Sequence, residues 1–334
     1  MFEAILAPFR WIMSWILGAF HSVLEAVGLP SDSGWTWALS ILLLVVLIRT
    51  LLIPLFVKQI NAQRAMQTLQ PELKKLQAKY KGKKDQLSRQ AMALEQQALM
   101  KEHGANPFAA CLPLLLQMPF FFALYQVLVQ ARGAAERGEG MDALSADQIR
   151  SFESSQVFGA QMSDTFMGAL GQPGGTPVVV VALALILLMS GSMFFMQKML
   201  MTKNMNQTAL EGPMMQTQQV MLYAMPLIFG IGGINFPIGV LLYWTYSNFW
   251  AVGQQWWIIR NNPTPGSLAE QELNERRAAK GLPPVGTKVT EAAATAGSAH
   301  AASRESTGPV LNGEAQPSAG GQRPQPQRKN RRKK

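Results

Sequence analysis

Residues 212–259 read GPMMQTQQVMLYAMPLIFGIGGINFPIGVLLYWTYSNFWAVGQQWWII, and none of these 48 residues carries a charge. About 20 apolar residues cross a bilayer as a helix, so the stretch is long enough for two crossings. The triplet Asn235-Phe236-Pro237 divides it, because proline ends a helix close to the preceding residue. The stretch therefore predicts two membrane-spanning helices, at residues 218–234 and 236–258.

Three further runs are almost free of charge, with Arg49 as their sole charged residue. They are residues 33–57, 108–131 and 165–197. In the whole chain of 334 residues only 15% are charged, whereas soluble domains carry about 25%. We predict three more spans, at residues 37–57, 107–130 and 177–197. The runs lack the alternation typical of barrel strands, so the predicted fold class is an all-α, polytopic membrane protein with a core of five transmembrane helices.

Lysine and arginine predict the orientation, because they concentrate in cytoplasmic loops. The net charge is +6 for residues 58–106, −3 for residues 131–176 and +7 for the tail from Arg260. We therefore expect residues 58–106, the loop 198–217 and the tail in the cytoplasm. The loop 131–176 and the amino end are expected outside.

Residues 1–30 combine aromatic and aliphatic side chains with Arg10, His21 and Glu25. This pattern favours an amphipathic helix that lies in the outer membrane interface. A short extra span or an uncleaved signal anchor is the alternative.

Residues 58–106 carry apolar side chains at spacings of three and four, with Gly82 between two groups of them. The spacing predicts an antiparallel helical hairpin that projects into the cytoplasm. A charged connector that only sets the topology is the simpler interpretation. The apolar positions of the two arms are Ile60, Met66, Leu69, Leu73, Leu76 and Tyr80, and Leu87, Met92, Leu94 and Leu99.

Residues 261–334 are rich in Pro, Gly, Ala, Ser and Gln, which predicts a disordered tail. The tail ends in a basic cluster, which suits ribosomal RNA or anionic lipid headgroups, or serves only to keep the tail inside. The cluster consists of Arg328, Lys329, Arg331, Arg332, Lys333 and Lys334.

Arg49 is the most informative single residue. A charge near the centre of a transmembrane helix costs about 2.5 to 3.5 kcal/mol on insertion scales, which usually marks a functional residue. It lies 12 residues after Trp37, or about 18 Å along a helix. No predicted span offers it a carboxylate. We interpret it as a receptor for negative charge, with snorkelling to the inner surface as the alternative.

Four other polar or amphipathic residues fall at a comparable depth when consecutive spans run in opposite directions. They are Gln117, Ser190, Trp244 and Asn248. We expect them to form a wet pocket with Arg49. In the alternative, each bonds only to a neighbouring helix.

The sequence gives little evidence for a catalytic site. His21, His103 and His300 lie outside the five spans, and the sequence has no G-x-x-x-x-G-K-[ST] loop. The single Cys111 is best read as a buried packing residue. We expect no catalytic residue, metal or other cofactor, and hence no enzyme.

Four blocks of sequence, in this order, resemble the YidC-type membrane protein insertases, which are related to mitochondrial and chloroplast insertases. The blocks are Arg49–Pro54 (RTLLIP), Asn106–Phe120 (NPFAACLPLLLQMPF), Met193–Lys198 (MFFMQK) and Phe236–Asn248 (FPIGVLLYWTYSN). We expect a short form, without the large extracytoplasmic domain of Gram-negative members.

The resemblance implies five helices around a hydrophilic groove that is open to cytoplasm and lipid and sealed outside. It matches Arg49 with the arginine that lies in the groove of family members. It matches Gln117 and Trp244 with positions that face the groove or contact the client. One turn before the arginine, some relatives have a hydroxyl residue where this chain has Val45. The hairpin matches a mobile client-capture element, for which the expected residues are Lys74, Lys75, Lys83 and Lys84.

The implied function is an insertase and chaperone of the bacterial plasma membrane. Its expected partners are nascent membrane proteins and the lipid bilayer, with a Sec-type translocon and, through the tail, the ribosome as further candidates. A monomer suffices for this function. The competing interpretations are a small-anion transporter that uses Arg49 as its anion site, and a purely structural assembly scaffold.

Overall fold

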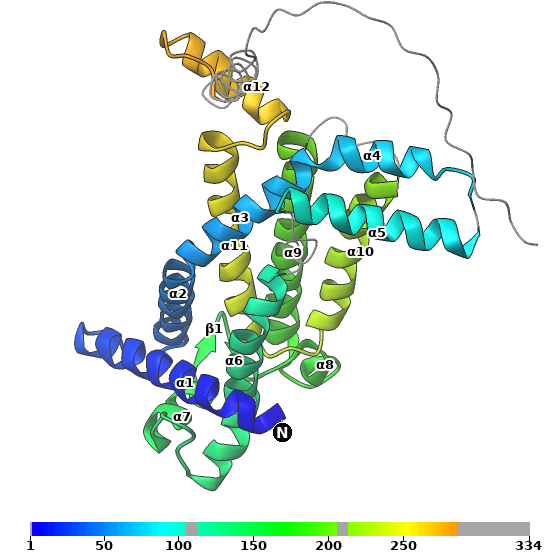
Figure 1. Ribbon diagram of the computed structural model, residues 1–334. Coiled ribbons are helices and arrows are strands. Elements are labelled where there is room, and N and C mark those ends of the chain that lie inside the picture. Colours follow the sequence, from blue (N-terminus) through cyan, green and yellow to red (C-terminus); the bar gives the residue numbers. More distant parts are fainter. Residues whose placement is uncertain (1, 84, 105–111, 206–212, 286–334) are drawn as a thin grey trace, which may run out of the picture. The chain divides into compact units, whose positions relative to one another are not determined.

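A computed structural model describes residues 2–83, 85–104, 112–205 and 213–285. Apart from one short pair of strands, its regular elements are helices (Figure 1). Five long helices overlap the residue ranges predicted as spans, and their crossing of a membrane stays a prediction. Among them, α11 contacts α2, α6 and α9, while α10 contacts α9. Their bounds are Gly34–Leu51 for α2, Leu112–Arg137 for α6, Thr176–Met199 for α9, Pro213–Gly233 for α10 and Ile238–Asn261 for α11.

Several helices are candidates for membrane spans. Within the described residues, Ala4–Ala26, Gly34–Leu51 and Thr176–Asn204 are both long and apolar enough. The helices α6, α10 and α11 have 26, 21 and 24 residues. At 1.5 Å per residue, each is also long enough to cross a hydrocarbon core of about 30 Å.

The first span departs from its predicted bounds at the inner end. α2 ends at Leu51, and a new helix, α3 (Ile53–Thr68), begins two residues later. Pro54 stands in the first turn of α3, where its missing N–H has no helical partner to lose. The chain therefore changes helix directly after Arg49, rather than at Val57.

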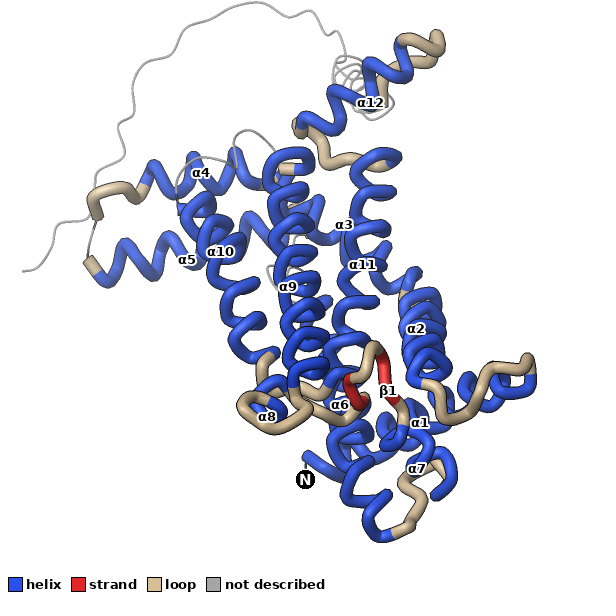
Figure 2. The backbone as a smooth tube through the Cα atoms, turned by 180° about the vertical axis from the view of Figure 1, so that it is seen from behind, coloured by secondary structure: helices blue, strands red, loops and turns tan. Residues whose placement is uncertain are grey.

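α1 (Phe2–Ala26) is a single helix that packs against α2 and α6. Both backbone views show it lying across one end of the long helices (Figures 1 and 2). Leu6, Met13 and Leu17 are buried, whereas Trp11 and Trp15 are more than half exposed. This division into two faces suits the interfacial helix better than the extra span, and the interfacial position stays a prediction.

Residues 138–175, here called the cap, are folded rather than merely connecting. They contain α7 (Ala146–Ser154), the strands β1 (Gln156–Val157) and β2 (Ala160–Gln161), and α8 (Phe166–Ala169). The strands are antiparallel, with Val157 paired to Ala160. Apolar side chains of the cap belong to the same core as the long helices. The charge of this segment indicated a loop, but its apolar residues pack into the core of the bundle.

Trp37 joins α1, α2 and the cap. Its side chain is fully buried, and its ring stacks on His21 with centroids 4.0 Å apart. Phe152 of the cap meets it edge-on at 5.3 Å. The indole Nε1 donates a 3.0 Å hydrogen bond to the hydroxyl of Ser151. One aromatic residue thus ties three elements together.

The hairpin has three helical pieces: α3, α4 (Gln70–Lys79) and α5 (Gln86–Glu102). Gly82 has φ = 88° in the turn before α5, a conformation that favours glycine. Leu69 and Leu73 are buried against Met66, Leu99 and Met100.

The apolar positions of α5 do not all face α4. Leu87 and Leu94 are 78% and 66% exposed. They are seven residues apart, as are Met92 and Leu99, and the two stripes lie on different sides of α5. A single facing helix contacts only one of these stripes.

The tail is not disordered from its start. α12 (Leu268–Ala278) follows an N-cap, Ser267, whose hydroxyl accepts a 3.3 Å hydrogen bond from the amide of Glu270. The buried amide of Thr264 donates a 2.9 Å hydrogen bond to Oδ1 of Asn204, in the π-helical turn Leu200–Asn204. The predicted disorder was therefore wrong for α12, because a local capping signal is hidden within a low-complexity composition. The basic cluster 328–334 and Cys111 lie outside the described residues.

Candidate functional site

Arg49 lies in the last turn of α2 and is partly buried. Its Nη2 donates a 3.4 Å hydrogen bond to the backbone carbonyl of Ser247 on α11. Its Cζ lies 5.6 Å from the ring centroid of Phe56 on α3. The guanidinium is thus held between α2, α3 and α11.

Gln117 of α6 joins the same region through Tyr243 of α11. Nε2 of Gln117 donates a 2.5 Å hydrogen bond to the hydroxyl oxygen of Tyr243, and the tyrosine is only 3% exposed. Tyr243 lies one helical turn before Ser247, whose backbone carbonyl accepts the Arg49 hydrogen bond. Four residues from three long helices, Arg49, Gln117, Tyr243 and Ser247, therefore form one polar layer, here called the arginine layer.

Some polar atoms of the arginine layer have no hydrogen-bond partner within the described residues. Nε of Arg49 and the side-chain hydroxyl of Ser247 are buried without a hydrogen-bond partner among the described residues. An unsatisfied buried polar group costs about 1 to 3 kcal/mol. The sequence also has no carboxylate between Asp32 and Glu72, or between Glu211 and Glu270. The layer is therefore suited to a polar or negatively charged group from outside the chain.

The other predicted pocket residues lie on different faces. Asn248 donates its amide to the carbonyl of Met189 on α9 at 3.3 Å. The hydroxyl of Ser190 faces α10, 2.9 Å from where a side chain at Gly230 would begin. Asn248 thus bonds to a neighbouring helix, as in the alternative interpretation, whereas the buried Ser190 hydroxyl has no hydrogen-bond partner among the described residues. No hydrogen bond joins either residue to Arg49 in the described structure.

Trp244 lies in an aromatic cluster rather than beside Arg49. Its ring centroid is 4.8 Å from that of Phe121 on α6 and 4.9 Å from that of Phe229 on α10. Phe236 lies 5.7 Å away. Because neighbouring residues of a helix point about 100° apart, Tyr243 and Trp244 belong to different faces of α11.

Sequence reasoning missed Tyr243 and Ser247. The two residues are four positions apart and so share one face of α11, as do Trp244 and Asn248 one position later. Both pairs lie in the block Phe236–Asn248, and periodicity alone does not say which of them faces α2. Val45, where some relatives have a hydroxyl, is 1% exposed and packed in the core.

In the hairpin, the basic residue with the clearest contact is Lys79. Its Nζ lies 2.8 Å from both carboxylate oxygens of Glu95, which also accepts a 2.8 Å hydrogen bond from the Tyr80 hydroxyl. These hydrogen bonds raise the pKa of Lys79 and lower that of Glu95. Lys75 and Lys83 are exposed and Lys74 is partly buried, whereas Lys84 lies outside the described residues.

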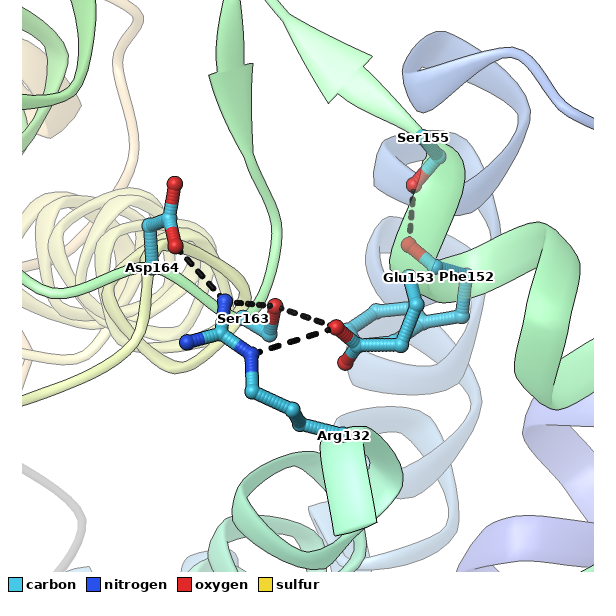
Figure 3. Close-up of polar contacts among 6 residues, drawn as sticks. All are labelled: Arg132, Phe152, Glu153, Ser155, Ser163 and Asp164. Atoms are coloured by element: carbon cyan, nitrogen blue, oxygen red, sulfur yellow. Dashed lines mark hydrogen bonds and ion pairs between the residues drawn. The ribbon is translucent and has the colours of Figure 1, made fainter. Parts of the chain in front are cut away.

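Arg132, near the end of α6, differs from Arg49 in that it is paired with carboxylates (Figure 3). Its Nη2 lies 2.7 Å from Asp164 and 2.9 Å from the hydroxyl of Ser163. Its Nε lies 3.5 Å from Glu153. The hydrogen bond with Asp164 raises the pKa of Arg132 above its ordinary value. Arg132 links the cap to α6, whereas Arg49 has no carboxylate partner among the described residues.

Within the described ranges, no group of three histidine, cysteine, aspartate or glutamate side chains is placed to hold a metal ion. The arginine layer itself offers hydrogen bonds and positive charge. None of these groups is a nucleophile paired with a base in the described structure.

The 60Kd inner membrane protein family matches residues 28–265 of the chain, which is more than half of its length. The chain belongs to this family. The match contains the arginine layer and the helices from α2 to α11, and it ends before α12. The chain is accordingly a polytopic membrane protein of the YidC insertase family, whose members are insertases rather than enzymes.

Several relatives carry the name membrane protein insertase YidC. The one from Streptomyces avermitilis is 48% identical over 269 residues, which is 79% of this chain and 60% of the relative. The one from Tropheryma whipplei strain Twist is 42% identical over 82% of this chain and 89% of the relative. The one from Mycobacterium tuberculosis H37Rv is 32% identical over 89% and 84%. This insertase-family chain thus spans less than two thirds of the Streptomyces relative and over four fifths of the other two.

Proposed function

We propose that the chain inserts nascent membrane proteins into the bilayer, and that the arginine layer receives the hydrophilic segment of the client that must cross. The observation that carries this proposal is the state of Arg49: a partly buried guanidinium with one weak hydrogen bond and no carboxylate partner among the described residues. A charge placed there without a partner within the chain is suited to a partner that arrives and leaves.

The chemistry favours an acidic client segment. At an effective dielectric constant near 20, two opposite charges 4 Å apart attract by about 4 kcal/mol. Tyr243 and Ser247 add hydroxyl groups that donate or accept hydrogen bonds. Together these groups solvate the client's polar segment part-way across the bilayer. The thickness of hydrocarbon that the segment must still cross is therefore smaller.

The driving force is the partition of the client's own apolar helix into lipid. Where the outside is positive, the membrane potential adds about 2.3 kcal/mol per negative charge per 100 mV. Exposed apolar side chains cover the flank of α9 and α10 that faces away from the core, and they offer a path into lipid. They include Leu183, Leu187, Leu188, Leu227, Ile228 and Ile231.

We place the protein in a bacterial plasma membrane with the hairpin, the loop 198–217 and the tail in the cytoplasm. The amino end and the cap are then outside, which is supported by the −3 charge of residues 131–176. In this orientation the hairpin meets nascent chains first, and Lys74, Lys75, Lys83 and Lys84 are the residues offered to them. The Sec translocon and, through the basic tail, the ribosome are the proposed further partners of a monomeric insertase.

The test is insertion of an acidic-tailed client into vesicles that carry Arg49→Lys, Arg49→Ala or Arg49→Glu. We expect activity to fall in that order, because charge is kept, removed and then reversed. Arg150→Ala, which removes an exposed arginine from the cap, is the matched control. If Arg49→Glu inserts the acidic client as well as the unaltered protein does, the charge-receptor mechanism is wrong.

The same vesicle experiments distinguish the insertase from two other functions. A structural scaffold predicts that Arg49→Ala leaves insertion intact. An anion transporter predicts flux of chloride or phosphate without any client, and loss of that flux in Arg49→Ala. Insertion that depends on Arg49, without such a flux, supports the insertase.

A further inference from the structure

A cleft of about 690 Å³ lies where the end of α9, the π-helical turn, the end of α11 and α12 meet. We call it the α12 cleft. Its lining includes Phe195, Lys198, Lys203, Trp256, Arg260 and Glu275.

The lining changes from apolar to charged along the two long helices. Phe195 and Trp256 are 56% and 54% exposed, and both stand about one turn before a basic residue, Lys198 and Arg260. Aromatic rings followed by cations at helix ends are typical of the level where hydrocarbon gives way to lipid headgroups. The cleft is therefore amphipathic in the direction in which a phospholipid is amphipathic.

Two of the four cations that line the cleft interact with oxygen atoms of the chain, and the other two have no carboxylate partner among the described residues. Lys203 is ion-paired with Glu272, and Arg276 donates to the backbone carbonyl of Arg260 at 2.8 Å. Lys198 and Arg260 have no carboxylate partner in the part of the chain that the structure describes. Their charges face rings instead: Lys198 lies 6.0 Å from the centroid of Phe194, and Arg260 lies 5.4 Å from that of Trp256.

We propose that the α12 cleft binds the headgroup of an anionic phospholipid, phosphatidylglycerol, with its phosphate between Lys198 and Arg260. Basic pockets at helix ends bind acidic headgroups in this way. The acyl chains then lie along Phe195 and Trp256. The carboxylate of Glu275 repels a bare phosphate monoester but accepts hydrogen bonds from the glycerol hydroxyls, so phosphatidylglycerol is preferred to phosphatidic acid. The assignment to the cytoplasmic leaflet rests on the proposed orientation, whereas the binding itself does not.

The experiment is a lipid titration of the purified full-length chain in detergent, followed by native mass spectrometry. We expect dioleoyl phosphatidylglycerol to bind more tightly than dioleoyl phosphatidylcholine or dioleoyl phosphatidic acid. The double variant Lys198→Gln, Arg260→Gln is expected to lose affinity for phosphatidylglycerol by about tenfold, or about 1.4 kcal/mol. The matched control is Arg89→Gln, Lys101→Gln, which removes the same charge from exposed positions of α5 and should keep the affinity.

The proposal is overturned if the two double variants bind phosphatidylglycerol equally. It is also overturned if glycerol phosphate displaces the lipid at equal concentration, which assigns the cleft to a soluble phosphate, or if an acidic peptide does so. A single Arg260→Lys variant that retains binding shows that charge is responsible, and a matching circular dichroism spectrum shows that the double variant is folded. Arg49→Ala should keep lipid binding, so failure here and failure of the insertase proposal are distinguishable.

Discussion

Gln117 and Tyr243 are 126 positions apart in the sequence, and Nε2 of the first donates a 2.5 Å hydrogen bond to the hydroxyl of the second. This bond joins α6 to α11 beside the only charged residue of α2. It positions the tyrosine that lies one helical turn before Ser247, whose backbone carbonyl accepts a hydrogen bond from Arg49. The arginine layer is thus partly organised by two uncharged residues.

The first prediction concerns this bond. Tyr243→Phe removes the hydroxyl and leaves the Gln117 amide without its partner, so we expect a loss of about 1 kcal/mol in the free energy of unfolding. A double-mutant cycle with Gln117→Leu, measured by denaturant unfolding in detergent, should give a coupling of about 0.6 to 1.7 kcal/mol. Tyr246→Phe is the control, because no described residue bonds its hydroxyl; additive single effects would contradict the prediction.

The second prediction concerns the cap. Arg132→Gln breaks contacts with Asp164, Ser163 and Glu153 at once. The arginine side chain is 47% exposed, so we expect only about 1 kcal/mol of lost stability together with faster proteolysis of residues 138–175. Arg150→Gln breaks an exposed pair within α7 and should change neither measurement. Equal effects of the two variants would show that the cluster does not hold the cap.

The third prediction is a pH dependence of the hairpin. The pKa of Glu95 lies below its ordinary value of 4.5, so its stabilising contribution is present above pH 4.5 and lost as the pH falls through the lowered pKa. The pKa of Lys79 lies above 10.5, so its contribution is present below pH 10.5 and lost above the raised pKa. Spin-label distances between α4 and α5 should therefore be shortest between these limits.

Glu95→Gln should flatten this dependence on the acid side. Glu102→Gln, which removes an exposed carboxylate from the end of the same helix, should leave it intact. A hairpin whose distances ignore pH in all three proteins would count against the ion pair.

The fourth prediction concerns α12. Asn204→Leu leaves the buried amide of Thr264 unsatisfied, which costs about 1 to 3 kcal/mol. We expect faster hydrogen exchange across residues 264–278 without a change elsewhere. Thr202→Val, at an exposed neighbour whose hydroxyl bonds only the carbonyl of Lys198, is the control. Unchanged exchange in Asn204→Leu would mean that α12 is held by other contacts.

Much of the architecture follows from local sequence. The absence of charge predicts long helices, because a polar backbone in hydrocarbon must satisfy itself. The break between α10 and α11 follows from Pro237, and the hairpin turn from Gly82. The importance of Arg49 follows from its being the sole charge in a run of 25 residues.

Other features required contacts between distant segments. Periodicity gives the faces of α11 but not their neighbours, so it suggested Trp244 and Asn248 where the structure brings Tyr243 and Ser247 to Arg49. The cap and α12 were read from average charge and composition, which hide the few apolar and capping residues that decide packing. Sequence by itself therefore determined the class of fold, the helix breaks and the isolated arginine. Only the tertiary structure decided what surrounds that arginine, because helix–helix contacts depend on the rotation of each helix about its axis, which packing sets.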